Sequence, residues 1–143
     1  MCIRDRLNKE LADKWTIILA VRAQAVADIA NFCENGFLKS SLDAHVQIHC
    51  SSALAKQLQS VDMAELTVTS KCTVLIDEAS HSGNAARIVI LKAEGNRCAR
   101  SRKLSPSVGA DEEFPDLSAR DVKVVRARRV EMRESAARFA TGT

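Results

Sequence analysis

A short polar segment near the middle of the chain brings together side-chain types that a hydrolytic site could use. Asp77 and Glu78 precede His81 and Ser82, so carboxylates, an imidazole and a hydroxyl lie within six residues of the chain. Nucleophilic catalysis needs such groups fixed by element ends beside oxyanion donors, and no such frame is predicted around them. Since glycine and asparagine follow, we interpret residues 77–84 as the polar tip of a hairpin that joins two strands.

The other histidines and the cysteines do not have a metal-binding spacing. His45 and His49 lie four residues apart on an expected strand, where their side chains share a face but lie far apart. The cysteines are odd in number, widely spaced and mostly within apolar segments: Cys2, Cys33, Cys50, Cys72 and Cys98. We therefore expect reduced thiols in a cytoplasmic protein rather than a disulfide framework.

Several classes of function lack their sequence signals. Neither G-x-x-x-x-G-K-S/T nor G-x-G-x-x-G occurs, so no phosphate-binding loop is indicated. The apolar stretch 15–30 is interrupted by Arg22, Gln24 and Asp28, and there is no signal-peptide pattern, so we expect no membrane contact. A chain of 143 residues suffices for one small domain with a tail.

The C-terminal third of the chain is basic. Residues 97–143 hold 11 Lys and Arg against 7 Asp and Glu, whereas residues 1–96 hold 10 against 11. This asymmetry favours contact with a polyanion, because neutralised phosphates release counterions; a solvated basic surface is the alternative on charge alone. Phe114 and Phe139 are the only aromatic residues there, so contact with RNA would be directed to the phosphate backbone. The candidate RNA-contact residues are Arg97, Arg100, Arg102, Lys103, Arg120, Lys123 and Arg126, with Arg128 and Arg129 beside them.

The first two thirds of the chain predict helix, strand, helix, strand, strand. Apolar residues at three- and four-residue steps predict a long helix over 8–34, with Trp15 and Phe32 as core anchors and Asn35-Gly36 as its end. Strands are expected over 44–50, 66–76 and 86–93, and a helix over 51–61 begins at Ser51 or Ser52. The fold class is α+β: a long N-terminal helix on a small three-stranded sheet with a second helix.

The last third predicts an irregular segment and then a charged helix. Residues 95–121 contain both prolines and no periodic apolar face, whereas 122–139 have weak helical amphipathicity. Residues 1–6 resemble the translation of a transposon-end adapter used in sequencing libraries, so we expect an artefact there and a chain truncated upstream.

The spacing of many residues resembles the C-terminal zinc knuckle of isoleucine–tRNA ligases. That family has A-x-G-x-K-C-x-R-C-W, then V-G, then P-x-L-C-x-R-C, and this chain matches it in order at Ala93, Gly95, Arg97, Cys98, Arg100, Val108, Gly109, Pro115, Leu117 and Arg120. Upstream, Trp15, Arg22 and the segment 38–44 resemble the family's W, R and I-G-S-S-L-E-A, although Lys39 replaces the glycine. The resemblance covers about residues 8–125.

The metal-binding part of the family pattern is degenerate in this chain. Of the four family cysteines only Cys98 remains, and the other positions hold Ser101, Ser118 and Asp121, while Arg102 replaces the tryptophan. Serine hydroxyls are poor zinc ligands, so we expect that zinc binding has disappeared. Without metal, the knuckle must be held by Val108, Phe114, Pro115 and Leu117, and by a Ser118 or Asp121 cap on the last helix.

The resemblance implies a tRNA-binding fragment of isoleucine–tRNA ligase, with no catalytic residues of its own. The full-length enzyme would use ATP and magnesium to attach isoleucine to tRNA, but the class I signatures H-I-G-H and K-M-S-K-S are absent here. On this interpretation, 7–36 ends the anticodon-binding helical domain, 37–94 is a small α+β domain, 95–125 is the knuckle and 126–143 is a helical tail. The partners would be tRNA and the rest of a monomeric, cytoplasmic synthetase. A free-standing RNA-binding module and a purely structural appendage are the alternatives.

Overall fold

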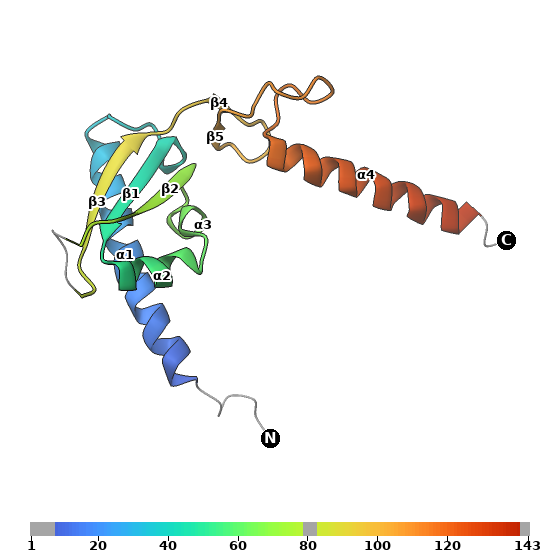
Figure 1. Ribbon diagram of the computed structural model, residues 1–143. Coiled ribbons are helices and arrows are strands. Elements are labelled where there is room, and N and C mark those ends of the chain that lie inside the picture. The colour runs from blue at the N-terminus through green and yellow to red at the C-terminus, as the bar shows by residue number, and fades with distance from the viewer. Residues whose placement is uncertain (1–7, 79–82, 141–143) are drawn as a thin grey trace. The chain divides into compact units, whose positions relative to one another are not determined.

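The chain divides into two compact units, here called unit 1 (Met1–Ala93) and unit 2 (Glu94–Thr143). The computed structural model describes residues 8–78 and 83–140 (Figure 1). Residues 1–6, which we interpreted as adapter-derived, lie outside the described residues. The α+β class predicted from sequence is confirmed, with a long N-terminal helix, a three-stranded sheet and a C-terminal helix.

The first element, α1 (Lys9–Glu34), agrees with the helix predicted over 8–34 and ends at the predicted Asn35-Gly36. Asn8 caps it by accepting a hydrogen bond from the amide of Leu11 at 3.1 Å. At the other end Asn35 is the C-cap, and Gly36 has a φ of +75°, a left-handed conformation that glycine adopts without strain.

The buried face of α1 is narrower than the predicted apolar stripe. Its buried residues are Ile18, Val21, Ala25 and Ile29, and Trp15 packs against them as predicted. Phe32 is 37% exposed and meets Phe37 edge to face at 5.5 Å between ring centroids, so its prediction as a core anchor was wrong. Other large apolar side chains on α1 are also exposed: Leu11, Leu19 and Val26.

Among the described residues, α1 is the one helix long and apolar enough to cross a membrane on length and composition, with a mean hydropathy of 1.4. Core helices of globular proteins meet the same criterion, and four residues of α1 are buried in the core of unit 1. The finding is weak evidence for a membrane segment.

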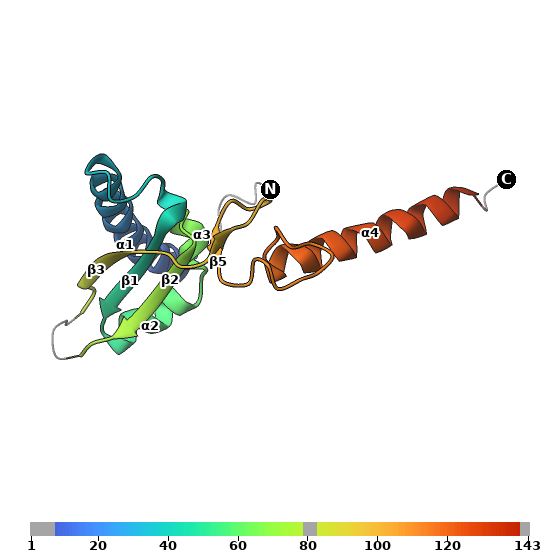
Figure 2. The ribbon, with the colours of Figure 1, turned by 90° about the horizontal axis from the view of Figure 1, so that it is seen from above.

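The sheet is built around the central strand β1 (Ala44–Cys50), which follows a short 3-10 helix, η2 (Ser41–Asp43). β2 (Lys71–Ile76) runs parallel to β1 on one side, and β3 (Ala86–Lys92) runs antiparallel to it on the other (Figure 2). Every second residue of β1 is completely buried, as alternation predicted: Ala44, Val46, Ile48 and Cys50.

The connection between β2 and β3 is not a hairpin, because β1 lies between these two strands. The helical crossover after β1 places β2 parallel to it at one edge, which leaves the other edge for β3. Glu78 accepts a hydrogen bond from the amide of Ser52 at 2.8 Å, so this end of the connection is held at the start of the helix that begins at Ser52. His81 and Ser82, which the sequence placed beside Asp77 and Glu78, lie outside the described residues.

Two helices form the crossover from β1 to β2. α2 (Ser52–Gln59) has Ser51 as its N-cap, in agreement with the sequence. The second, α3 (Met63–Thr67), occupies the beginning of the strand predicted over 66–76, and that part of the prediction was wrong. Asp62 caps α3, and Val68 ends it with a φ of 56°, so the strand begins only at Lys71.

Unit 2 consists of a two-stranded ladder and one helix. β4 (Asn96–Arg97) pairs antiparallel with β5 (Leu104–Ser105), and α4 (Ala119–Ala140) begins three residues before the predicted start at 122. The small core contains Cys98, Val108, Leu117 and Val122, with Phe114 and Val125 packed against it. Val108, Phe114 and Leu117 are therefore confirmed as packing residues, whereas Pro115 is exposed.

Candidate functional site

The four positions at which the resemblance led us to expect cysteines meet at one point of unit 2. We call Cys98, Ser101, Ser118 and Asp121 the Cys98 cluster. Cys98 lies in the turn between β4 and β5, where its amide donates to the carbonyl of Lys103 at 2.9 Å and its own carbonyl accepts from the amide of Arg102 at 2.9 Å. Ser118 caps α4, since its carbonyl accepts from the amide of Val122 at 2.9 Å. The amide of Ala99 donates to the carbonyl of Asp116 at 2.9 Å, which joins these two segments.

Direct hydrogen bonds join the members of the Cys98 cluster. The Cys98 thiol donates to Oδ2 of Asp121 at 3.0 Å, and Ser118 Oγ donates to the same oxygen at 2.9 Å. The amide of Ser118 donates to Cys98 Sγ at 3.3 Å. Cys98 is completely buried, and Ser118 and Asp121 are each 8% exposed.

Hydrogen bonds keep Asp121 acidic in spite of its burial. Burial raises the pKa of Asp121, but the hydrogen bonds from Cys98, Ser118 and Ser101 and the charge of Arg100 lower it more, to below the usual 3.8. Burial likewise raises the pKa of Cys98, and hydrogen bonds with Ser101 and the Ser118 amide bring it below the usual 9.0. At neutral pH the cluster therefore contains a carboxylate that accepts hydrogen bonds.

The cluster does not fit a zinc ion. A closed structural zinc site needs four good donors, and here two are hydroxyls while the remaining thiol and carboxylate already bind one another. Arg100 Nε also lies 3.9 Å from Oδ1 of Asp121, so a cation stands beside the carboxylate. Over residues 8–78 and 83–140, no group of three or more His, Cys, Asp or Glu side chains could hold a metal.

In unit 1, His45 lies on β1, the strand expected from the sequence, and its Nε2 is 2.8 Å from Thr73 Oγ1.

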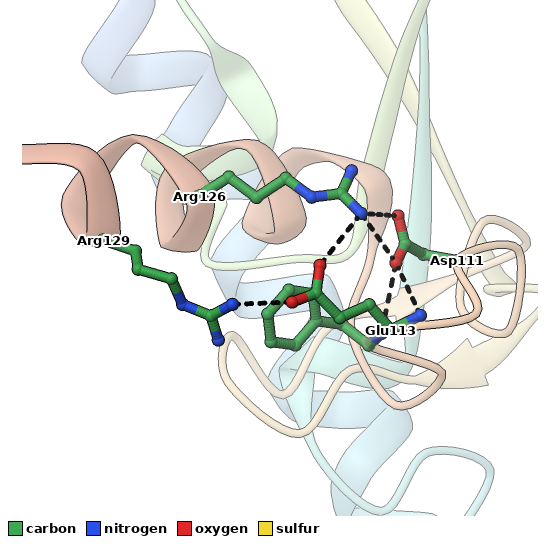
Figure 3. A network of polar contacts seen from close by, with 5 residues as sticks. Asp111, Glu113, Arg126 and Arg129 are labelled. Atoms are coloured by element: carbon green, nitrogen blue, oxygen red, sulfur yellow. Dashed lines mark hydrogen bonds and ion pairs between the residues drawn. The ribbon is translucent and has the colours of Figure 1, made fainter.

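A second network ties the loop before α4 to the helix (Figure 3). Arg126 Nη2 lies 3.0 Å from Asp111 Oδ2 and 3.4 Å from Glu113 Oε2, and Arg129 Nη1 lies 2.6 Å from Glu113 Oε1. The guanidinium carbon of Arg129 lies 5.2 Å from the centre of the Phe114 ring, and that of Arg126 lies 6.0 Å from it. The hydrogen bonds from Arg129 and Arg126 hold the pKa of Glu113 below its usual value.

All seven predicted RNA-contact residues lie in unit 2, but their side chains differ in how they are engaged. Arg126 is held by two carboxylates, and Arg97 Nη1 donates to the carbonyl of Arg102 at 2.7 Å. Within the described part of the chain, the following basic side chains of unit 2 make no hydrogen bond or ion pair: Arg102, Lys123, Arg128 and Arg133. Their role in RNA contact stays a prediction.

A groove along α4 was missed by the sequence analysis. It has a volume of about 540 Å³ and is lined by Arg100, Val125, Arg128, Arg129, Met132, Arg133 and Ala136. Three of the lining residues are apolar and four are arginines, and Met132 is 64% exposed. The sequence does contain a pattern that could have predicted it. Val125, Met132 and Ala136 follow one another at steps of seven and four residues, on a helix that we predicted to be only weakly amphipathic.

No family model matches the chain. Individual relatives do match it over most of its length. The isoleucine–tRNA ligase of Rhodopseudomonas palustris is 34% identical over 126 residues, which cover 81% of this chain and 12% of the relative. The same-named protein of Agrobacterium fabrum is 35% identical over 83% of this chain, and that of Brucella abortus 33% identical over 81%, each match spanning 13% of the relative. The chain thus spans about an eighth of the length of these relatives.

Proposed function

Because the chain belongs to the isoleucine–tRNA ligase family, we propose that it is the tRNA-binding C-terminal part of such an enzyme. The observation that carries the proposal is the similarity to the three ligases over more than four fifths of the chain. The complete cytoplasmic enzyme would attach isoleucine to its tRNA with ATP and magnesium. Since neither ATP signature occurs in these residues, amino-acid activation would take place elsewhere in the enzyme.

In this proposal, unit 2 contacts the phosphate backbone of tRNA. Within the described residues, Arg102 of the β4–β5 turn makes no ion pair, and the same holds for three basic residues of α4: Lys123, Arg128 and Arg133. These side chains could therefore bind phosphate without first breaking an ion pair inside the protein. Arg126 is the weakest of the predicted RNA-contact residues, because a phosphate would have to displace Asp111 and Glu113. The one described aromatic ring of unit 2, Phe114, lies beneath two arginines, so base stacking is not its role.

Unit 1 would join unit 2 to the rest of the enzyme. The exposed apolar residues of α1, Leu11, Leu19 and Val26, are 49%, 49% and 38% exposed, and they would pack against the helical anticodon-binding domain. The relatives contain about seven times more chain outside the matched region, which is where such a partner would come from.

Affinity for tRNA as a function of salt tests the proposal. Replacing Lys123, Arg128 and Arg133 together by Gln should weaken binding and flatten the plot of log K against log salt, by about 0.7–0.9 for each phosphate that is no longer neutralised. The matched control replaces three exposed basic residues of unit 1 by Gln: Lys56, Lys71 and Arg87. Equal affinity and slope for both variants and the unaltered chain would contradict a role of unit 2 in phosphate binding and favour a structural appendage.

A further inference from the structure

We infer that unit 2 is a metal-independent knuckle, in which the hydrogen-bonded Cys98 cluster closes the two segments that a zinc ion closes in a four-cysteine knuckle. The cluster is defined above as Cys98, Ser101, Ser118 and Asp121. The inference concerns how unit 2 is held together and does not depend on whether it binds tRNA.

The positions of the cluster keep the geometry of a zinc knuckle. Cys98 and Ser101 are three residues apart in the β4–β5 turn, and Ser118 and Asp121 are three residues apart at the start of α4. This is the C-x-x-C spacing in both halves, and two hydrogen bonds, of 3.0 and 3.3 Å, join Cys98 of one half to Asp121 and Ser118 of the other. The backbone adds one more link there, from the amide of Ala99 to the carbonyl of Asp116 at 2.9 Å.

The polar atoms that a metal would need are already used. Oδ2 of Asp121 accepts from Cys98 and from Ser118, and Cys98 Sγ both donates to Asp121 and accepts from the Ser118 amide. A zinc ion would have to remove the thiol proton, break these bonds and accept two hydroxyl ligands, with the Arg100 cation nearby. The hydrogen-bonded state is complete without it.

The surrounding apolar side chains explain why hydrogen bonds suffice. Val108, Leu117 and Val122 are at most 9% exposed and form one small core with Cys98. Cys98 is completely buried and Ser118 and Asp121 are nearly so, so the hydrogen bonds among these three residues are stronger than at the surface, and an unpaired group there would be costly. The cluster and this small core stabilise the same packing of the turn against α4.

The first test measures metal content and local stability together. The 143-residue chain is dialysed without chelator, zinc is measured by elemental analysis, and hydrogen exchange of the amides of Cys98, Arg102 and Val122 is followed with and without EDTA. We expect zinc far below one ion per chain and the same exchange rates in both conditions. Stoichiometric zinc, or amides that exchange faster in EDTA, would overturn the inference.

The second test restores the metal site and stays informative if single substitutions in the cluster prevent folding. The variant with Ser101→Cys, Ser118→Cys and Asp121→Cys should bind one zinc per chain together with Cys98, and EDTA should then speed the exchange of the same amides. Cobalt(II) should give the visible absorption bands of tetrahedral thiolate ligation. The control variant Cys33→Ser, Cys50→Ala and Cys72→Ala keeps the cluster and removes the three thiols of unit 1 that the structure describes. Failure of the restored variant to bind zinc or cobalt would show that the four positions do not converge, and would refute the inference.

Discussion

The backbone of Ser105 and Pro106 lies so close to Gly95 that we predict Gly95→Ala to destabilise the knuckle. Gly95 has a φ of +104°, and a Cβ added there would fall on the backbone carbonyl of Ser105 and 2.5 Å from the nitrogen of Pro106. A side chain in this conformation costs about 1–2 kcal/mol, and forcing atoms into packed backbone adds about 1–3 kcal/mol. The expected decrease in the stability of unit 2 is therefore about 2–5 kcal/mol.

Gly109→Ala is the matched control. Gly109 lies in the same unit with a φ of +97°, but its added Cβ would meet only the carbonyl oxygen of Pro115, at 4.0 Å. We expect a decrease of about 1–2 kcal/mol from conformation alone. Hydrogen exchange of the Cys98 and Arg102 amides measures the opening free energy of the knuckle in both variants. Equal decreases in the two variants would refute the reasoning that the β4 and β5 backbones approach too closely for any side chain at 95.

Three further predictions follow from the cluster, the ion-pair network and the core. The pKa of Asp121 in the folded protein lies below its usual 3.8, so the stability that its carboxylate contributes is fully present well above pH 3.8 and is lost as pH falls through the folded pKa. Protection of the unit 2 amides from hydrogen exchange should decrease over that acidic range, and Asp121→Asn should remove this pH dependence. The same pH profile in the variant and the unaltered chain would contradict the prediction. Replacing Asp111 by Asn and Glu113 by Gln should release two arginines and steepen the salt dependence of tRNA affinity, and an unchanged slope would show that these arginines do not reach phosphates. Ile48→Ala should destabilise unit 1 by about 2–5 kcal/mol in urea unfolding, whereas Ile76→Ala, at a residue 59% exposed, should change stability by less than about 0.5 kcal/mol.

Local signals in the sequence were sufficient where short-range physics decides the structure. β1 was predicted with its observed bounds because every second residue faces the core and is apolar. The ends of α1 and the cap at Ser51 were predicted because capping depends on residues within one turn.

Of the wrong predictions in unit 1, that of a strand over 66–76 overlooked local helix signals, and the other two concerned contacts with distant parts of the chain. Val and Thr residues favoured a strand over 66–76, but the Asp62 cap and the left-handed Val68 form and end α3 there. The hairpin prediction failed because a sequence does not show which edge of β1 a later strand will take. Phe32 followed the apolar spacing of α1, yet it is 37% exposed and meets Phe37 rather than the core.

The candidate site shows the same limit. Ser118 and Asp121 lie 20 and 23 positions from Cys98, so only the resemblance to a family motif brought them together in advance. The spacing of charges along the sequence does not show that Arg126 pairs with Asp111, 15 positions away. A count of basic residues therefore identified the basic unit but did not distinguish its engaged arginines from the others.

The most direct test of the claim that this chain is one part of a longer tRNA-charging enzyme is the sequence of the coding DNA upstream of Leu7. We predict an open reading frame that continues in frame into a class I synthetase with both H-I-G-H and K-M-S-K-S. A stop codon followed by a genuine start immediately before Leu7 would contradict that claim, and the chain would then be a free-standing RNA-binding module.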